Sequence, residues 1–172
     1  NDFWKHALAT GICSRMLAKR CGYLNPEEAF TCGLLHDIGK LVLHELDKKH
    51  LHAITETARA KSQSFLATEF ELGTLNHCTL GKLLASRWGL PQSIVSVIEH
   101  HNSKYEELGG LPEEHRRLVQ IVGLANLVAV HHKIGNSGNY SNGFYSEEKC
   151  FELGLQKNQV QEIGEAVLRE FS

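Results

Sequence analysis

The sequence predicts an all-α protein that folds as a single helical bundle. Three observations lead to this prediction. Apolar residues recur at helical spacing along most of the 172 residues, helix start and stop signals separate the apolar segments, and no segment alternates as a strand does. We find no internal repeat and no second domain, so residues 1–172 are expected to form one domain.

Helical spacing and capping residues define the expected elements. The first helix covers residues 3–20, where Leu8 and Ile12 share one side. Asn25 and Pro26 form a strong start signal for the second, which ends near the pair His36-Asp37. The remaining helices are expected, in order, from Leu41 to Leu46, over 48–61, within 62–75, from the cap Asn76 to Trp88, from Pro91 to His101, over 113–133, and near 146–153 and 157–171.

Two other segments have a distinctive composition. The middle of the long helix, from Leu118 to Val130, is apolar nearly all round, which predicts a central position in the bundle. Residues 102–112 are expected to form a loop. Residues 135–145, with the sequence GNSGNYSNGFY, are rich in glycine and asparagine and predict a flexible surface loop.

Composition excludes several classes of function. The 18 basic and 20 acidic residues nearly cancel, and no block of like charge predicts binding to nucleic acid or to an anionic membrane surface. No apolar stretch reaches the roughly 18 residues of a membrane span, and no signal peptide opens the chain. The five cysteines form no CxxC pair and lie mostly in apolar helical stretches, which favours a reducing, cytoplasmic location.

Histidine is the unusual residue type, with eleven in the chain. Those that fit no ligand pattern are taken as surface or hydrogen-bonded core residues: His44, His50, His52, His115, His131 and His132. The others form an ordered set around the pair His36-Asp37 in the segment GLLHDIGK, together with His6, His77 and the pair His100-His101. Adjacent histidine and aspartate place a nitrogen and an oxygen ligand close together, so the ordered set predicts a metal site.

The ligand types indicate which metals and which chemistry. Imidazole nitrogens with a carboxylate suit one or two divalent transition-metal ions such as iron, manganese, zinc or nickel. Because a carboxylate can bridge two ions, Asp37 is the expected shared ligand of a two-metal centre that activates water for phosphoryl displacement. On a helical path Lys40 projects to the same side as Asp37 and could neutralise a phosphate oxygen, which makes both candidate catalytic residues. The alternative for Lys40 is a solvated surface lysine.

The ordered set resembles the HD superfamily of metal-dependent phosphohydrolases, and within it the HDOD subgroup of bacterial signalling domains. The resemblance covers roughly residues 2–133 and is carried by His6 in FWKHALAT, by the pair in GLLHDIGK, by His77, by the WGLP step, and by IVSVIEHHN. It implies an all-α domain with the site inside the bundle. In related enzymes the positions of His6, His36 and Asp37 hold one metal, and those of Asp37, His77, His100 and His101 hold the second.

The sequence departs from the superfamily pattern in three places. Asn126, in VGLANLVAV, stands where the superfamily usually has a last aspartate ligand; it could ligate weakly through its carbonyl oxygen or serve as a core amide. The segment HHNSKYEELGG lacks the Gly-Tyr-Pro signature of cyclic dinucleotide phosphodiesterases, which argues against cyclic di-GMP hydrolysis. Complete HDOD domains have helices ahead of the position of His6, so the chain is expected to be part of a longer protein.

Two functions remain at this point. The first is a signal-transduction module that keeps a metal site with weak or no turnover, and that works with other signalling domains or proteins. The second is an active phosphohydrolase, a phosphodiesterase or nucleotidase, acting on a phosphoester or nucleotide ligand. The retained histidines and Asp37 favour a working metal site, whereas Asn126 and the missing signature favour the module. No stretch of the sequence identifies a base or sugar.

Overall fold

The protein is helical throughout its regular structure. The computed structural model describes residues 2–172, and no strand occurs among them. The helices are α1 Asp2–Arg20, α2 Pro26–Leu35, α3 Ile38–Leu46, α4 Lys48–Lys61, α5 Phe65–Glu71, α6 His77–Arg87, α7 Gln92–His100, the short 3-10 helix η1 Tyr105–Leu108, α8 Glu113–His131, α9 Glu147–Phe151 and α10 Lys157–Glu170. The prediction of an all-α fold is confirmed.

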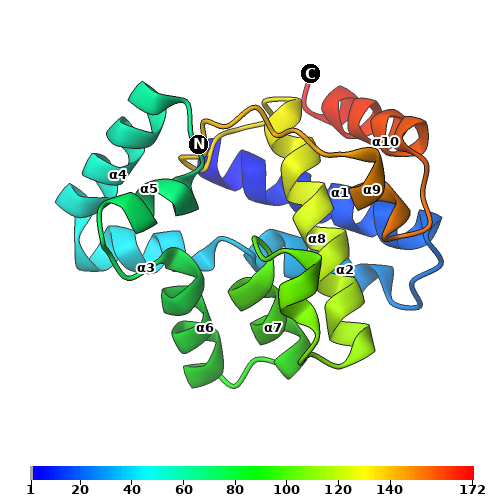
Figure 1. Ribbon diagram of the computed structural model, residues 1–172, viewed down its shortest axis with the longest axis horizontal. Helices are drawn as coiled ribbons and strands as arrows, with labels where there is room; N and C mark the ends of the chain where they lie inside the picture. Colours follow the sequence, from blue (N-terminus) through cyan, green and yellow to red (C-terminus); the bar gives the residue numbers. More distant parts are fainter. Residues whose placement is uncertain (1) are drawn as a thin grey trace.

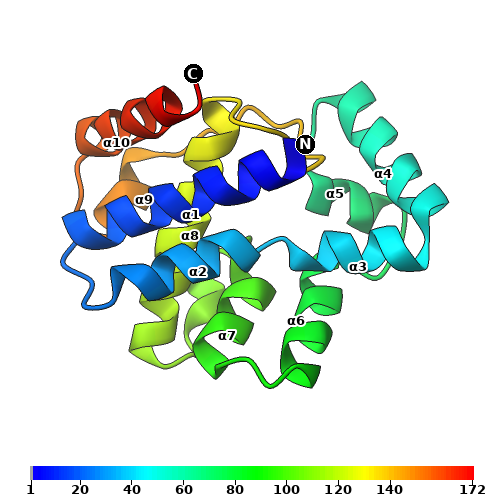
Figure 2. The same ribbon diagram turned by 180° about the vertical axis from the view of Figure 1, so that it is seen from behind.

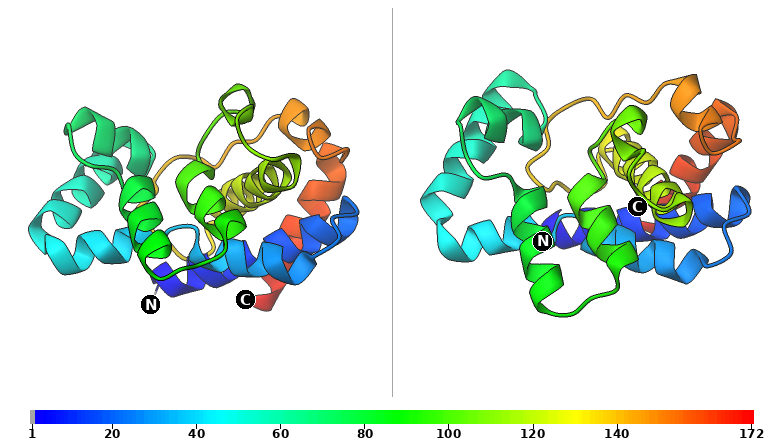
Figure 3. Two further views of the ribbon diagram at one scale, coloured as in Figure 1. Left: turned by 90° about the horizontal axis from the view of Figure 1, so that it is seen from below. Right: turned by 60° about the horizontal axis from the view of Figure 1, so that its bottom comes forward.

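Helix α8 lies across the antiparallel pair α1 and α2, and α7 packs against both α2 and α8 (Figures 1 and 2). Helices α4 and α5 lie at one end of the molecule and α9 and α10 at the other, in these views and in Figure 3. Helix α3 packs against α6 and α4. The junction between α2 and α3 therefore connects the part of the bundle formed by α1, α2, α7 and α8 to the part formed by α3, α4 and α6.

Capping side chains explain where two of these helices begin. The side chain of Asn25 accepts a hydrogen bond from the Glu28 amide at 3.2 Å, directly before Pro26. Asn76 accepts from the Thr79 amide at 2.9 Å and so fixes the start of α6. Each cap satisfies one of the free amides of the first turn, which is worth about 1 kcal/mol.

The apolar core has two parts. The larger lies between α1, α2, α7, α8 and α10 and includes the fully buried side chains of Leu17, Ile98 and Leu124. The smaller consists of Leu43, Ile54 and Phe65, with partly buried neighbours, and holds α3, α4 and α5 together. Burying each such side chain contributes about 2 kcal/mol relative to its exposure, so packing rather than helix propensity holds the bundle together.

Two glycines allow the backbones of α3 and α6 to touch. A methyl group at Gly39 would lie 1.8 Å from the carbonyl oxygen of His77 and 2.7 Å from the amide nitrogen of Gly81. No side chain can replace the glycine hydrogen without moving one helix. This contact fixes His77, the first residue of α6, against the start of α3.

The segment 135–145 is a loop, as expected, but it lies only partly on the surface. Ser137 and Tyr145 are buried, the Asn136 amide donates to the Asp2 carbonyl at 3.0 Å, and the Tyr140 amide donates to the Gln63 carbonyl at 3.1 Å. The loop therefore joins the start of α1 to the end of α4. Its asparagines build short local turns, in which the side chains accept from amides two residues on, at Asn136, Asn139 and Asn142.

Smaller differences concern helix ends. The helix expected within 62–75 is restricted to α5, the long helix ends at His131 rather than residue 133, and the loop 102–112 contains η1. In the described part of the chain, every helix is too short or too polar to cross a bilayer.

Candidate metal centre

Four helices and one helix junction bring most of the predicted ligands together. The residues that meet are all at most 7% exposed, and they are His6, His36, Asp37, His77, His101 and Asn126. His6 projects from α1, the pair His36-Asp37 forms the break between α2 and α3, and Asn126 comes from the middle of α8. Charged or polar groups at this depth need partners to compensate for lost hydration.

The carboxylate of Asp37 lies at the centre of the cluster. Its Oδ1 atom is 3.3 Å from Nε2 of His77 and 3.5 Å from Nε2 of His101. Its Oδ2 atom is 3.4 Å from Nε2 of His36. The residue expected to be shared is thus the one that faces imidazoles from three directions.

Hydrogen bonds on the far side of each ring fix how these imidazoles are oriented. Nδ1 of His36 lies 2.6 Å from the Gly33 carbonyl, and Nδ1 of His101 lies 3.1 Å from the Ile98 carbonyl. A carbonyl only accepts, so each Nδ1 carries a proton, and in the neutral form of each ring the unprotonated Nε2 faces Asp37. Within the described residues, Nε2 of His36 has no hydrogen-bond donor.

Glu69 fixes the third imidazole. This fully buried carboxylate accepts from Nδ1 of His77 at 2.7 Å and, through its other oxygen, from the His77 backbone amide at 2.7 Å. The sequence did not identify Glu69, because it lies on α5 two residues from the exposed Glu71 and nothing local distinguishes them.

This arrangement fits a metal ion. In their neutral form His36 and His101 each present an Nε2 lone pair to the Asp37 carboxylate, and these lone pairs repel it unless a cation lies between them. Outer hydrogen bonds that fix the tautomer and aim of the ligating nitrogen are typical of histidines at metal sites. The residues present therefore suit a divalent cation held by imidazole and carboxylate groups.

His6 and Asn126 form the side of the cluster nearest α8. Nε2 of His6 lies 3.0 Å from Oδ1 of Asn126, and one potential ligand atom from each of His6, His36 and Asp37 lies within 4.8 Å of the others. As an amide oxygen only accepts, His6 donates this hydrogen bond and its Nε2 carries a proton. That proton would have to leave before His6 could ligate through Nε2.

His100 does not belong to the cluster, contrary to the sequence prediction. Its Nε2 lies 3.4 Å from a carboxylate oxygen of Glu99 and its Nδ1 lies 3.4 Å from the Ser103 hydroxyl. His100 is the last residue of α7 and His101 directly follows it. Adjacent helical residues point about 100° apart, and the backbone does not turn enough to aim both rings inward.

Lys40 is buried rather than solvated. Its Nζ atom lies 2.7 Å from Oδ2 of Asp37 and 3.1 Å from the Ser137 hydroxyl, above the ring of Phe65. Burial raises the pKa of Asp37, but the Lys40 ammonium and neighbouring His36 outweigh burial and hold that pKa well below its ordinary value.

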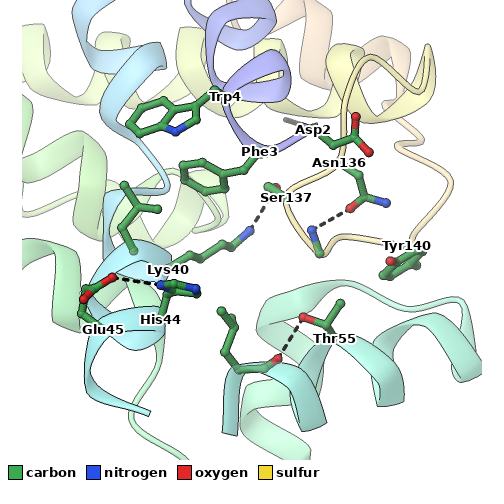
Figure 4. A pocket seen from close by; sticks show the side chains of 13 residues that line it. Asp2, Phe3, Trp4, Lys40, His44, Glu45, Thr55, Asn136, Ser137 and Tyr140 are labelled. Carbon is green, nitrogen blue, oxygen red and sulfur yellow. Dashed lines mark hydrogen bonds and ion pairs between the residues drawn. The ribbon is translucent and has the colours of Figure 1, made fainter. Parts of the chain in front are cut away.

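Lys40 also borders a cavity of about 600 Å³ (Figure 4). The cavity is lined on one side by Phe3 and Trp4 of α1 and on the other by Thr55 of α4 and the loop residue Tyr140. Its size suits a small molecule. A ligand in this cavity could contact Lys40, whose ammonium in turn contacts the Asp37 carboxylate.

Burial is the main influence on the imidazoles. It lowers the pKa of His6 to about 3 and also lowers the pKa of His101. Burial opposes protonation of His77 too, but the neighbouring Cys78 and Asp37 outweigh it and raise the pKa of His77 well above its ordinary value. The cluster therefore keeps His6 and His101 neutral at pH 7, which is the form that can ligate a metal.

We expect the metal-free domain to lose stability as the pH falls below 6.5, the ordinary histidine pKa. There the unfolded chain binds protons at His6 and His101 while the folded protein does not, so the free energy of unfolding decreases. Each group contributes up to about 1.4 kcal/mol per pH unit. The pKa of His77 is raised, so its contribution to stability changes with pH only above pH 6.5 and does not offset this loss.

Thermal unfolding in chelator, followed between about pH 7 and about pH 4.5, tests this for the wild type and His6→Asn. The variant should show the shallower decline. An equal decline in both proteins would contradict a neutral, buried His6.

Comparison with known proteins places this geometry in context. The family model described as HDOD domain matches residues 1–104. An uncharacterised protein of Treponema pallidum is 29% identical over 127 residues, which are 73% of this chain and 24% of that protein. The chain therefore spans about a quarter of the length of that relative.

Two crystal structures share the fold. One, from Marinobacter aquaeolei, is provisionally described as a signal transduction protein; it superposes with a TM-score of 0.82 at 20% identity, covering 98% of this chain and 36% of that one. The other, from Shewanella amazonensis, is provisionally described as a phosphohydrolase and has a TM-score of 0.69 at 26% identity, covering 98% of this chain and 59% of that one.

Proposed function

The chain belongs to the HDOD family, and we propose that it is a signal-transduction domain whose buried cluster binds one or two divalent metal ions with little or no turnover. The observation that carries this proposal is the set of three imidazole Nε2 atoms aimed at one carboxylate, each within 3.5 Å of an Asp37 oxygen. Iron, manganese, zinc and nickel are the candidate ions.

Three features support weak turnover. Asn126 supplies no charge at its position, and it accepts a hydrogen bond from His6 Nε2, whose proton opposes ligation through that nitrogen. Lys40 is already paired with Asp37 and Ser137, so its charge is not free for a phosphate. The ligand atoms are buried, which restricts access of a substrate.

The metal would supply the centre with a positive charge that balances Asp37, and at an open coordination position it would activate water. The residues of the chain do the rest. Glu69 and the Gly33 and Ile98 carbonyls hold the imidazoles in place. Lys40 connects Asp37 to the cavity beside α1, where an anionic ligand such as a phosphoester or nucleotide would compete with Asp37 for the ammonium.

We also propose a cytoplasmic location and a place beside other signalling domains in a longer protein. The described cysteines, Cys13, Cys21, Cys32, Cys78 and Cys150, are all free thiols, as is usual in a reducing compartment. The chain matches about a quarter of its Treponema relative, so further domains in such proteins are consistent with a modular role.

An active phosphohydrolase is the second candidate. The cavity next to Lys40 and the fold shared with the Shewanella protein favour it. Elemental analysis of the purified protein, combined with a broad screen of phosphoesters, separates the two. We expect bound metal and hydrolysis at background level. Hydrolysis that is clear of background and disappears in Asp37→Ala would instead establish the enzyme.

Replacing Asn126 with aspartate is expected to tighten binding of the first metal about tenfold. The change Asn126→Asp restores a charged ligand opposite His6 and removes the neutral amide oxygen that accepts from it. Calorimetric metal titration measures the effect, and any phosphoester hydrolysis should rise with it. Asn142→Asp adds the same charge at an exposed position of the loop 135–145 and serves as the control. Unchanged affinity in Asn126→Asp would identify Asn126 as a core amide.

A further inference from the structure

Cys78 lies beside the cluster, although nothing in its sequence context marked it as functional. It is the second residue of α6 and directly follows His77. Its Sγ atom lies 3.5 Å from Nε2 of His77, and the ligating atoms of His77, Cys78 and His101 lie within 4.8 Å of one another. Cys13 and Cys32, by contrast, lie in the apolar core, where burial raises the pKa of each thiol to about 12.

Three spacings among His77, His101, Asp37 and Cys78 match the edges of a tetrahedral site. Metal–nitrogen and metal–oxygen bonds of about 2.0–2.1 Å and a metal–sulfur bond of about 2.3 Å give tetrahedral edges of about 3.3–3.6 Å. The observed separations are 3.3 Å from His77 Nε2 to Asp37 Oδ1, 3.5 Å from His101 Nε2 to the same oxygen, and 3.5 Å from His77 Nε2 to Cys78 Sγ. Three of the six edges are thus of ligand length without any rearrangement.

We propose that Cys78 is the fourth ligand of the metal held by His77, His101 and Asp37, so that this position has two nitrogens, one oxygen and one sulfur. This inference rests on the proposed metal centre and takes the place that His100 was expected to fill. As the metal–sulfur bond forms, the thiol releases its proton to solvent. The start of α6 favours the resulting negative charge, because a helix N-terminus carries a partial positive charge.

Asn102 is placed to support a bound thiolate. Its amide nitrogen lies 3.7 Å from Cys78 Sγ and 2.9 Å from Nε2 of His101. Once the imidazole lone pair is given to a metal, the amide can keep the sulfur as its acceptor. Cys78 and Asn102 also line a cavity of about 330 Å³, which gives an ion a path to the sulfur.

A sulfur ligand has two consequences. It shifts the preference of this position from manganese toward zinc or iron, because soft thiolates select these metals over ions that prefer oxygen. It also completes four protein ligands, and a closed four-ligand site is typical of structural rather than catalytic zinc. Cys78 would therefore be a second reason, independent of Asn126, for weak turnover.

Cobalt(II) substitution tests the proposal, because a cobalt–thiolate bond gives a near-ultraviolet charge-transfer band that nitrogen and oxygen ligands do not. Wild type, Cys78→Ser and the control Cys21→Ser are titrated with cobalt(II) and followed by absorbance, with elemental analysis for stoichiometry. Cys21 is a half-buried thiol that donates to the Ala18 carbonyl outside the cluster. We expect the band in wild type and Cys21→Ser, its loss in Cys78→Ser, and at least about tenfold weaker binding there.

The outcomes separate this inference from the proposed function. Cobalt that binds with visible ligand-field bands but no charge-transfer band would overturn the role of Cys78 and leave the metal centre intact. A charge-transfer band that persists in Cys78→Ser would assign the sulfur to another cysteine and also overturn it. Failure of all three proteins to bind cobalt or zinc would reject the metal centre itself. Circular dichroism of each variant shows that the helical fold is retained.

Discussion

Asp37→Ala is expected to reduce the metal content of the protein to one ion or none. The substitution removes the oxygen atoms that face His36, His77 and His101, and the remaining imidazoles cannot bridge two ions. Elemental analysis after gel filtration measures the loss. Unchanged metal content would contradict the central role of Asp37.

The same substitution should also destabilise the fold. Lys40 is 5% exposed and would be left as a buried ammonium without its carboxylate, which typically costs about 3–5 kcal/mol. The double change Asp37→Ala with Lys40→Met removes the stranded charge, so it should recover much of the stability while still failing to bind metal. Asp37→Asn and Asp47→Asn are a matched pair, because each removes one carboxylate charge. Asp47→Asn is the control, since Asp47 is exposed and caps α4, a role that asparagine can keep.

Gly39→Ala is expected to lower the free energy of unfolding by about 3 kcal/mol or more. A methyl group there would lie 1.8 Å from the His77 carbonyl oxygen, and the obstacle is backbone, which cannot rotate away. For a chain of this size, the midpoint of thermal unfolding should fall by about 6–12 °C. Metal binding should weaken as well, because displacement of α6 moves His77.

Gly109→Ala is the control for this prediction. Gly109 has an ordinary φ of −60°, and an added methyl group would meet no atom within 4 Å. Its melting temperature should stay close to that of the wild type. If Gly39→Ala melted at the same temperature as Gly109→Ala, the close contact of α3 and α6 would be refuted.

Local signals in the sequence were sufficient to predict the helices. Asn25, Pro26 and Asn76 begin helices for reasons that lie within one turn of each residue, so no knowledge of the fold was needed. The partial burial of the loop 135–145 was not predicted, because the loop is held by Asp2 and Gln63, which are distant in sequence. Composition alone cannot distinguish a loop with ordered local turns from a mobile one.

The candidate site was predictable in proportion to how strongly each residue type suggests a ligand. The pair His36-Asp37 and the spaced histidines stand out in any sequence, and the structure brings most of them together. Glu69 and Cys78 could not be found, because an acid on a short helix and a cysteine beside small residues have ordinary structural explanations. His100 was included because it adjoins His101. The direction of each side chain at a helix end depends on the local backbone turn, which the sequence does not show.

The cluster draws its side chains from positions 6 to 126, so it exists only when most of the chain has folded. A metal that binds the native state alone therefore acts by mass action on global unfolding. At a free concentration one hundred times its dissociation constant, a single ion adds about 2.7 kcal/mol to the free energy of unfolding. Metal supply would then set how long this domain survives proteolysis, and a change in ion availability would be read out as a change in its abundance.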